Sequence, residues 1–446
     1  MRFVIIGGDA AGMSAASRAK RTQPDLEVTV LEQTEDVSYS ACGMPYNIAD
    51  ARRPIDDLVV RAAQVFRDKQ GINLLTGHVA ETIDPINRTV AGQTSDGGTF
   101  AIPYDRLLIA TGAAAIMPDW PGVDAPGVMA LKTLEQGRRI KDYLKAQAVR
   151  QVVIIGMGYI ALEMCEALRT RDIAVTLVKP RPRFLPWMPP EMAQVVQNEV
   201  EAQGVDLHTG HAVASIQITG DGLQVVGPDL VLDGQMVIVA IGVTPNSAMA
   251  QRAGIELSAG RSIGVDERLQ TSMTHIYAAG DCADAVHVVT GRKAWIPLAL
   301  RANRAGWAVA DNVCGKTVKL PGIAGTAVFK VFDLQVARTG LNTQEATDAG
   351  FDPVAVTIKT RSRAHAHPDS ATIWVHMLGD RQSGRLLGVQ MVGREGVAHR
   401  INAPAVALLG KMEVEQFSQA DLAYAPPFGP VWDPLLTAAN QLEKQF

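Results

Sequence analysis

The 446-residue chain is poor in cysteine, with four in all, and carries no excess of charge of one sign, since 42 basic residues oppose 46 acidic ones. The cysteines follow no disulfide or zinc-ligand spacing, so we expect a reducing cytoplasm, no disulfide scaffold and no metal site. The net charge of −4 is dispersed and predicts neither a nucleic-acid surface nor a polybasic membrane anchor.

Long hydrophobic runs are also missing. No stretch approaches the roughly 18 consecutive apolar residues of a spanning helix. The apolar run at the N-terminus is short, contains glycines and leads into a polar segment, unlike a secretory signal. A hydrophobic content of 47% over this length instead predicts two or three globular domains.

A strand–helix–strand pattern occurs twice in the sequence. The first copy is "RFVIIGG" (2–8), a helical pattern from about Ala10 to Arg21, and "LEVTVLE" (26–32). The second copy spans residues 150–179. Each copy has the form of a βαβ nucleotide-binding unit, so the repeat predicts two bound nucleotides, or one nucleotide and a decayed site.

The rest of the chain completes three predicted domains. Apolar strands ending in glycine turns follow the copies at 104–113 and 235–246, another lies at 274–284, and a helix is predicted from about Pro297 to Cys314. We predict an α/β fold with two Rossmann-like dinucleotide-binding domains and a C-terminal α+β domain. The expected boundaries are 1–115 with 246–320 for the first, 116–245 for the second, and 321–446 for the third.

The first glycine turn has the chemistry of a pyrophosphate site. Gly7, Gly8 and Gly12 allow the backbone to turn beneath the phosphates, whose charge meets the N–H groups at the helix N-terminus. Glu32 ends the second strand, where a carboxylate can accept both hydroxyls of an adenosine ribose. Asp9 departs from the glycine fingerprint, so its side chain is expected to point away or cap the helix.

The second glycine turn reads Gly156-x-Gly158-x-x-Ala161. Its second strand ends in a basic stretch, in which Lys179 and Arg181 offer cations suited to a 2′-phosphate. The stretch therefore favours NADPH over NADH, and the alternative is a solvated basic loop.

Several motifs taken together resemble the two-dinucleotide flavoprotein disulfide reductases over essentially the whole chain. They are "VIIGGDAAG" with Glu32, "ATG" at 110–112, "IIGMGYIALE" and "YAAGDCAD". The resemblance implies that the first domain holds FAD, with Asp281 on its ribitol, that the second holds NAD(P)H, and that the third forms a homodimer interface.

The same resemblance implies the cofactor residues. For FAD they are Gly7, Gly8, Ala11, Gly12, Glu32, Gln33, Val79, Thr111, Gly112, Asp281 and Ala299. For the nicotinamide nucleotide they are Gly156, Gly158, Tyr159, Ile160, Glu163, Lys179, Arg181 and Gly242. Glu163 would approach the nicotinamide or pair with a cation near the flavin, and an exposed helix glutamate is the alternative.

The pattern around Cys42, "SYSACGMPY", resembles the single-cysteine branch of this family, because Asn47 stands where dithiol members carry the second cysteine. That branch comprises coenzyme A disulfide reductases, persulfide and polysulfide reductases, and NADH oxidases or peroxidases. Such a cysteine must react as a thiolate, and we expect the glycine-rich turn near a helix start to lower its pKa. The alternative is an inert thiol, which is how we interpret Cys165 and Cys282.

The closing segment "DLAYAPPFGPVWDPLLTAAN" (421–440) resembles the end of coenzyme A disulfide reductases. Tyr424 matches the tyrosine that serves as an acid for Cys42 of the partner subunit, although a packed interface tyrosine is equally compatible. A second tyrosine of those enzymes is absent here, and His367 is either its substitute or a polar loop residue.

Coenzyme A is a further candidate ligand. The residues matching the family's coenzyme A channel are Ser14, Arg18, Arg21, Ser38, Lys69 and Asn303. Arg18 and Arg21 lie on one helix face, where they could clamp phosphates or simply form a solvated basic helix end.

We therefore expect a homodimeric enzyme that passes hydride from NAD(P)H through FAD to Cys42 and reduces a coenzyme A disulfide, a persulfide or polysulfide. One alternative is an NAD(P)H oxidase or peroxidase in which Cys42 forms a sulfenic acid. Another is a non-catalytic, redox-sensing flavoprotein in which Cys42 only tunes the flavin.

Overall fold

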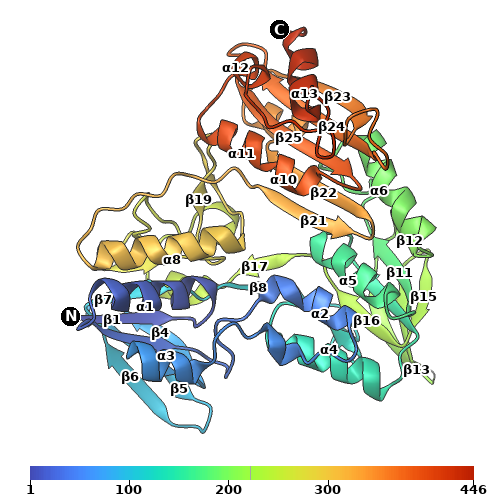
Figure 1. Cartoon of the computed structure of the whole chain (residues 1–446). Helices are drawn as coiled ribbons and strands as arrows, with labels where there is room; N and C mark the ends of the chain where they lie inside the picture. Colours follow the sequence, from blue (N-terminus) through green and yellow to red (C-terminus); the bar gives the residue numbers. More distant parts are fainter. Residues whose placement is uncertain (221) are drawn as a thin grey trace.

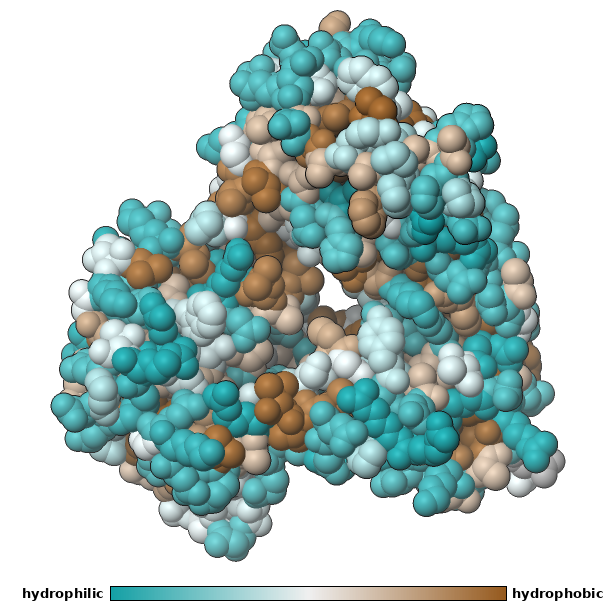
Figure 2. Space-filling view, viewed as in Figure 1, coloured by the Kyte–Doolittle hydropathy of each residue, from teal (hydrophilic) through white to brown (hydrophobic). Residues whose placement is uncertain are grey.

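The computed structural model describes residues 1–220 and 222–446, which form three lobes arranged in a triangle (Figure 1). The lobes surround an opening at the centre of the molecule, visible in the space-filling view (Figure 2).

The first lobe is built on a parallel sheet with the strand order β18-β7-β1-β2-β3. Helices α1 and α8 lie side by side over this sheet (Figure 1). They approach closely because Gly306 of α8 lacks a side chain: a Cβ there would lie 2.2 Å from the Ala11 carbonyl oxygen of α1.

The elements of the first lobe are β1 (Arg2–Ile6), α1 (Ala10–Thr22), β2 (Glu27–Leu31), a 3-10 helix (Ala41–Gly43), α2 (Met44–Ala49), a 3-10 helix (Ile55–Leu58), α3 (Ala63–Gln70), β3 (Asn73–Leu75), β4 (His78–Asp84), β5 (Thr89–Thr94), β6 (Thr99–Pro103), β7 (Arg106–Ile109), α7 (Ala248–Arg252), a 3-10 helix (Ala259–Arg261), β18 (Ile276–Ala278), β19 (Ala285–Val286), β20 (Lys293–Ala294) and α8 (Ala299–Val313). Strands β8 (Ala113–Ala115) and β17 (Val243–Pro245) pair at the passage to the second lobe.

The second lobe repeats this design with the parallel order β12-β11-β10-β16-β9 and an antiparallel sheet β13-β14-β15. Its elements are β9 (Val128–Met129), α4 (Leu134–Ala146), β10 (Gln151–Ile155), α5 (Tyr159–Arg169), β11 (Ala174–Lys179), α6 (Pro190–Ala202), β12 (Asp206–Thr209), β13 (Ser215–Thr219), β14 (Gly222–Val226), β15 (Val231–Gly234) and β16 (Met236–Val239).

The third lobe is an antiparallel sheet, β21-β22-β25-β24-β23, covered by short helices. Its elements are β21 (Ala327–Val331), β22 (Leu334–Gly340), α9 (Thr343–Asp348), β23 (Pro353–Arg361), β24 (Thr372–Asp380), β25 (Leu386–Gly393), α10 (Val397–Arg400), α11 (Asn402–Leu409), α12 (Val414–Ser418) and α13 (Pro434–Glu443).

Helix α2 joins the lobes. Although it follows the first glycine turn in sequence, its Met44 and Ile48 are buried in the apolar core of the second lobe, together with Leu162 of α5. Phe329 of β21, from the third lobe, belongs to the same core. The segment that carries Cys42 is therefore fixed at the junction of all three lobes.

The predicted fold class is confirmed, including both Rossmann-like units and the C-terminal α+β domain. The helix expected from Ala10 to Arg21 is α1, and the one expected from Pro297 to Cys314 is α8. The exact domain boundaries stay a prediction. Across the described ranges, we find no helix that combines the length and the apolar character needed to cross a membrane.

Candidate active site

The first glycine turn connects β1 to α1 and leaves room where a pyrophosphate would lie. Gly7 has a φ of 108°, and a Cβ on Gly12 would lie 1.8 Å from the Gly7 carbonyl oxygen. Only glycine fits these positions, which brings the first N–H groups of α1 to the open end of the sheet. The residues present fit the pyrophosphate of FAD.

Two carboxylates flank this turn. Glu32, directly after β2, accepts a hydrogen bond from the Gly8 amide at 2.8 Å. Asp9 stands at the N-cap of α1 but makes no side-chain cap there, so of the two alternatives predicted for it, pointing away or capping the helix, the capping one is wrong. Its Oδ1 instead accepts from the Tyr39 amide at 3.4 Å, and burial raises the pKa of Asp9 to about 6.

Asp281 follows β18 and meets a cation that sequence reasoning missed. Lys132 Nζ lies 2.9 Å from Asp281 Oδ2, and both side chains are mostly buried. Lys132 is held at the start of α4 by a capping box between Thr133 and Gln136. The capping box is visible in the sequence as "TLEQ", but its proximity to Asp281 is not.

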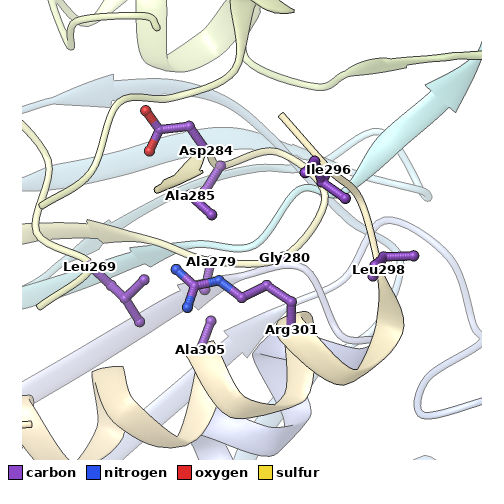
Figure 3. A pocket seen from close by; sticks show the side chains of 10 residues that line it. Leu269, Ala279, Gly280, Asp284, Ala285, Ile296, Leu298, Arg301 and Ala305 are labelled. Carbon is purple, nitrogen blue, oxygen red and sulfur yellow. The ribbon is translucent and has the colours of Figure 1, made fainter. Parts of the chain in front are cut away.

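A small pocket is lined by Gly280, the residue before this aspartate, and by Arg301 and Ala305 of α8 (Figure 3). Its free space of about 10 Å³ suits one water molecule rather than a cofactor. Arg301 and Asp284 both line it (Figure 3); Asp284 Oδ1 lies 3.0 Å from Lys293 Nζ, and Asp284 Oδ2 is buried without a hydrogen-bond partner. The pocket therefore belongs to the packing beneath the site.

Ala299, a predicted FAD contact, begins α8 and is exposed.

The second glycine turn connects β10 to α5. A Cβ on Gly156 would lie 2.2 Å from the Ala240 carbonyl oxygen, whereas a Cβ on Gly158 would meet nothing within 4 Å. The open space at Gly158 leaves the N-terminus of α5 accessible, as a nucleotide phosphate requires. Tyr159, Ile160 and Glu163 follow on α5.

The two predicted 2′-phosphate cations differ in their surroundings. Lys179 is buried, and its Nζ donates to the Arg183 carbonyl oxygen at 2.6 Å. Burial, and then the charge of Arg181, lower the pKa of Lys179. Arg181 is exposed, so it is the better placed of the two for a phosphate.

Cys42 lies in the 3-10 helix Ala41–Gly43, which runs directly into α2, and Cys42 is exposed to solvent. Removal of solvent by the neighbouring protein raises the pKa of the thiol, and the charge of Glu163 raises it further, while Lys132 lowers it. The expectation that the glycine-rich turn lowers this pKa is therefore wrong for the protein groups alone, because desolvation and a nearby carboxylate dominate.

Asn47 has a structural role in place of a second thiol. It is fully buried, its Nδ2 donates to the Pro54 carbonyl oxygen at 2.8 Å, and its Oδ1 accepts from Lys141 at 2.8 Å. Cys165 and Cys282 are buried as expected, and burial raises the pKa of Cys165 to about 12.

The two candidate acids lie on adjoining loops of the third lobe. Tyr424 is 48% exposed, and His367 Nδ1 lies 2.9 Å from the Pro368 carbonyl oxygen. The loops are linked by a hydrogen bond from the Ala364 amide to the Pro426 carbonyl oxygen at 3.2 Å. In Figure 1, α12 and α13, which flank the Tyr424 segment, lie at the end of the third lobe farthest from α2, so Tyr424 is placed to act toward a second subunit rather than toward Cys42 of its own chain.

The candidate coenzyme A residues are only partly brought together. Ser14 Oγ donates to Asn303 Oδ1 at 2.7 Å, so these two lie side by side. Arg18 instead binds Asp311 through two hydrogen bonds of 3.1 and 3.0 Å. Its guanidinium is committed to α8, so a phosphate clamp by Arg18 and Arg21 is not preformed.

The remaining predicted residues surround these turns. Arg21 and Lys69 are exposed, and Ser38 adopts a φ of 49°. Gln33 follows Glu32, Val79 lies on β4, Thr111 Oγ1 donates to the Asn246 carbonyl oxygen at 2.6 Å, and Gly112 and Gly242 have positive φ.

The fold, the two glycine turns and the exposed lone cysteine define an oxidoreductase that uses two dinucleotides. Models of two families match the chain: pyridine nucleotide-disulphide oxidoreductase over residues 1–306, and the dimerisation domain of the same group over 326–434. The chain belongs to the pyridine nucleotide-disulphide oxidoreductase family, and it is an NAD(P)H-dependent flavoprotein disulfide reductase, as its motifs predicted. Membership implies FAD and NAD(P)H as cofactors.

Three similar proteins illustrate the range of the family. The chain is 37% identical over 443 residues to the "NAD(P)H sulfur oxidoreductase (CoA-dependent)" of Pyrococcus furiosus, with 99% of each chain covered. It is 33% identical over 447 residues to the "NADH oxidase" of Methanocaldococcus jannaschii, covering 100% of this chain and 99% of the relative. The structure of an NAD-dependent persulfide reductase from A. fulgidus matches with a TM-score of 0.96 at 36% identity, covering 100% of this chain and 83% of that one.

Proposed function

We propose that the protein reduces coenzyme A disulfide, a coenzyme A persulfide or polysulfide with NAD(P)H, through Cys42 alone. The observation that carries the proposal is the exposed thiol of Cys42 together with the buried Asn47, five residues on, whose side chain binds Pro54 and Lys141. No second thiol can close an intramolecular disulfide at that position, so the substrate supplies the other sulfur. The coenzyme A dependence named for the Pyrococcus furiosus relative supports this choice of substrate.

The reaction balances with one cysteine. The Cys42 thiolate attacks one sulfur of the substrate disulfide, forms a mixed disulfide and releases one thiolate. Two electrons and a proton then cleave the mixed disulfide, regenerate the Cys42 thiolate and release the second thiol. FAD, when bound, supplies these electrons after NAD(P)H has delivered them as hydride.

Protein groups handle charge and protons. Lys132 favours the thiolate form of Cys42. Tyr424 of the partner subunit protonates the leaving thiolate, and His367 of the partner subunit lies on the adjoining loop. Arg181, being exposed, binds the 2′-phosphate of NADPH, which is the preferred donor. The active form is a homodimer, in keeping with the match to the dimerisation domain. The enzyme is cytoplasmic, in keeping with four cysteines that are all free.

Replacement of Cys42 tests this function. A Cys42→Ser protein is expected to retain FAD and its reduction by NAD(P)H, but to lose thiol release from coenzyme A disulfide and polysulfide. Cys314→Ser is the matched control, because Cys314 is a half-buried free thiol at the end of α8. Unchanged thiol release by Cys42→Ser would exclude the proposal.

The sulfenic acid alternative is tested in the same experiment. Its support is the NADH oxidase name of the Methanocaldococcus jannaschii relative together with an exposed thiol that peroxide can reach. Oxygen or peroxide consumption with NAD(P)H at the rate of disulfide reduction, lost in Cys42→Ser, would favour it.

A further inference from the structure

A side-chain hydrogen bond joins α2, the helix that follows Cys42, to α5 of the second lobe. Tyr46 lies on α2, one turn after Cys42, and its hydroxyl donates to Glu163 Oε1 at 2.9 Å. Glu163 lies on α5, shortly after the open glycine turn at Gly158. The bond thus spans from the reactive cysteine to the second nucleotide site.

The environment of this pair keeps the phenol as the donor. Burial and the Glu163 charge raise the pKa of Tyr46, so it holds its proton. Burial also raises the pKa of Glu163, whereas the hydrogen bond from Tyr46 lowers it and favours the carboxylate. Burial is the larger cause of the raised pKa of Cys42 and the Glu163 charge adds to it, so moving the Glu163 carboxylate from the place where Tyr46 holds it changes the fraction of thiolate.

A purely structural role for the pair is the weaker explanation. Helix α2 is already anchored by Lys141, whose Nζ donates to the carbonyl oxygens of Asn47 and Asp50 at 3.0 and 2.8 Å. Arg171 donates to the Ile48 carbonyl oxygen at 3.1 Å. Tyr46, in contrast, is 47% exposed, so a molecule bound in front of α5 can reach its bond to Glu163.

We propose that Tyr46 is a positioning residue that holds the Glu163 carboxylate beside Cys42 until a pyridine nucleotide binds. An amide N–H of the bound nucleotide then competes for the same carboxylate oxygen, draws Glu163 away from the thiol and makes Cys42 more reactive. The inference rests on the proposed function for the identity of the two sites, and it adds a coupling between them. Premature reaction of the thiol, before electrons are available, is thereby limited.

The test measures the alkylation rate of Cys42 rather than turnover. The FAD-containing enzyme, with Cys42 as the free thiol and the flavin oxidised, is treated with iodoacetamide at pH 7.5. The alkylated Cys42 peptide is quantified by mass spectrometry with and without NADP⁺, which binds but delivers no hydride. The variants are Tyr46→Phe and Glu163→Gln. The matched control is Tyr143→Phe, because the Tyr143 hydroxyl donates to the Gln235 carbonyl oxygen at 3.1 Å elsewhere in the second lobe.

In the unaltered enzyme and the control, NADP⁺ is expected to accelerate alkylation about threefold or more, a change of about half a pKa unit. Glu163→Gln should react fast without nucleotide and respond little to it, and Tyr46→Phe should fall between. The proposal is overturned if both variants alkylate at the rate of the unaltered enzyme with the same response to NADP⁺. A failed function would show separately, as unchanged thiol release by Cys42→Ser.

Discussion

The reactivity of Cys42 is set by single charges around it. Desolvation and Glu163 act against the thiolate, and Lys132 acts for it. Lys132 also pairs with Asp281, the predicted ribitol ligand, so one ammonium group serves both the cofactor residue and the thiol. Opposing charges, and not the turn geometry alone, thus determine the pKa of the Cys42 thiol.

The ionisation of Asp9 links the stability of the fold to pH. Its pKa is raised from 3.8 to about 6 by burial, so the folded protein retains a proton that the unfolded chain releases between these values. The stability contributed by protonated Asp9 is present at pH below 3.8 and is lost as the pH rises through about 6.

Asp9→Asn is therefore expected to stabilise the folded protein by about 1–2 kcal/mol at pH 8, with a smaller gain at pH 5. Melting temperatures at pH 5, 6.5 and 8 measure this gain. Asp25→Asn, at an exposed aspartate after α1, is the control and should show no such trend. A gain for Asp9→Asn that does not grow with pH would refute the assignment.

Arg181 determines the choice of donor if the 2′-phosphate binds where we propose. Arg181→Glu should raise KM for NADPH about tenfold or more while leaving KM for NADH nearly unchanged, because only NADPH carries the extra charge. Steady-state kinetics with both donors measures the ratio. The control is Arg150→Glu. Arg150 is exposed and directly precedes β10, at the end of the sheet opposite to Arg181, so its replacement should leave the ratio of the two KM values unchanged. Equal effects on both donors would contradict the role.

At the scale of elements, Arg400 at the end of α10 holds the loops that carry the two candidate acids. Its Nε donates to Asp433 Oδ2 at 2.7 Å, the cap of α13, and both side chains are largely buried. Its Nη2 donates to the carbonyl oxygens of Ser362 and Phe428 at 3.2 and 2.8 Å. One guanidinium thus joins the His367 loop to the Tyr424 segment.

Arg400→Ala should release these loops, since breaking a buried ion pair costs about 3 kcal/mol or more. We expect faster proteolysis within 420–433 and thiol release lowered about tenfold through misplacement of the acids. FAD reduction by NAD(P)H should stay unchanged. Arg381→Ala, at an exposed pair with Asp352 in the same lobe, is the control. Normal thiol release by a folded Arg400→Ala dimer would disprove the positioning role.

The elements were more predictable than the contacts between them. Glycine spacing and apolar runs predicted α1, α5 and their flanking strands, because those signals are local in the sequence. The pairs Lys132–Asp281 and Tyr46–Glu163 connect distant segments, and nothing in their spacing predicted them. Arg18 looked available on its helix face, but its partner Asp311 lies on a helix far along the chain.

At the scale of the whole molecule, Cys42 and Tyr424 lie in different lobes of one chain: Cys42 directly precedes α2, and Tyr424 lies in the exposed segment between α12 and α13 of the third lobe (Figure 1). The exposed segment includes Phe428, Val431 and Trp432, which are 79%, 65% and 64% exposed. Exposed apolar side chains that gather in one segment are typical of an interaction surface, which supports a site completed by a second subunit.

Mixed dimers test this arrangement. Cys42→Ser and Tyr424→Phe homodimers should each be nearly inactive in thiol release, but random exchange of their subunits should restore about a quarter of the normal rate, because half of the dimers then carry one intact composite site. Native mass spectrometry confirms the exchange. If verified mixed dimers remain inactive, Tyr424 does not act on Cys42 of the partner subunit.

The central claim is that Cys42 alone exchanges with the substrate disulfide, and its most direct test is mass spectrometry of the FAD-containing protein treated with coenzyme A disulfide without NAD(P)H. The account predicts one coenzyme A attached to the Cys42 peptide, one thiol released per subunit, and removal of the adduct by NAD(P)H. Absence of the adduct, or its formation on another cysteine in Cys42→Ser, would contradict it.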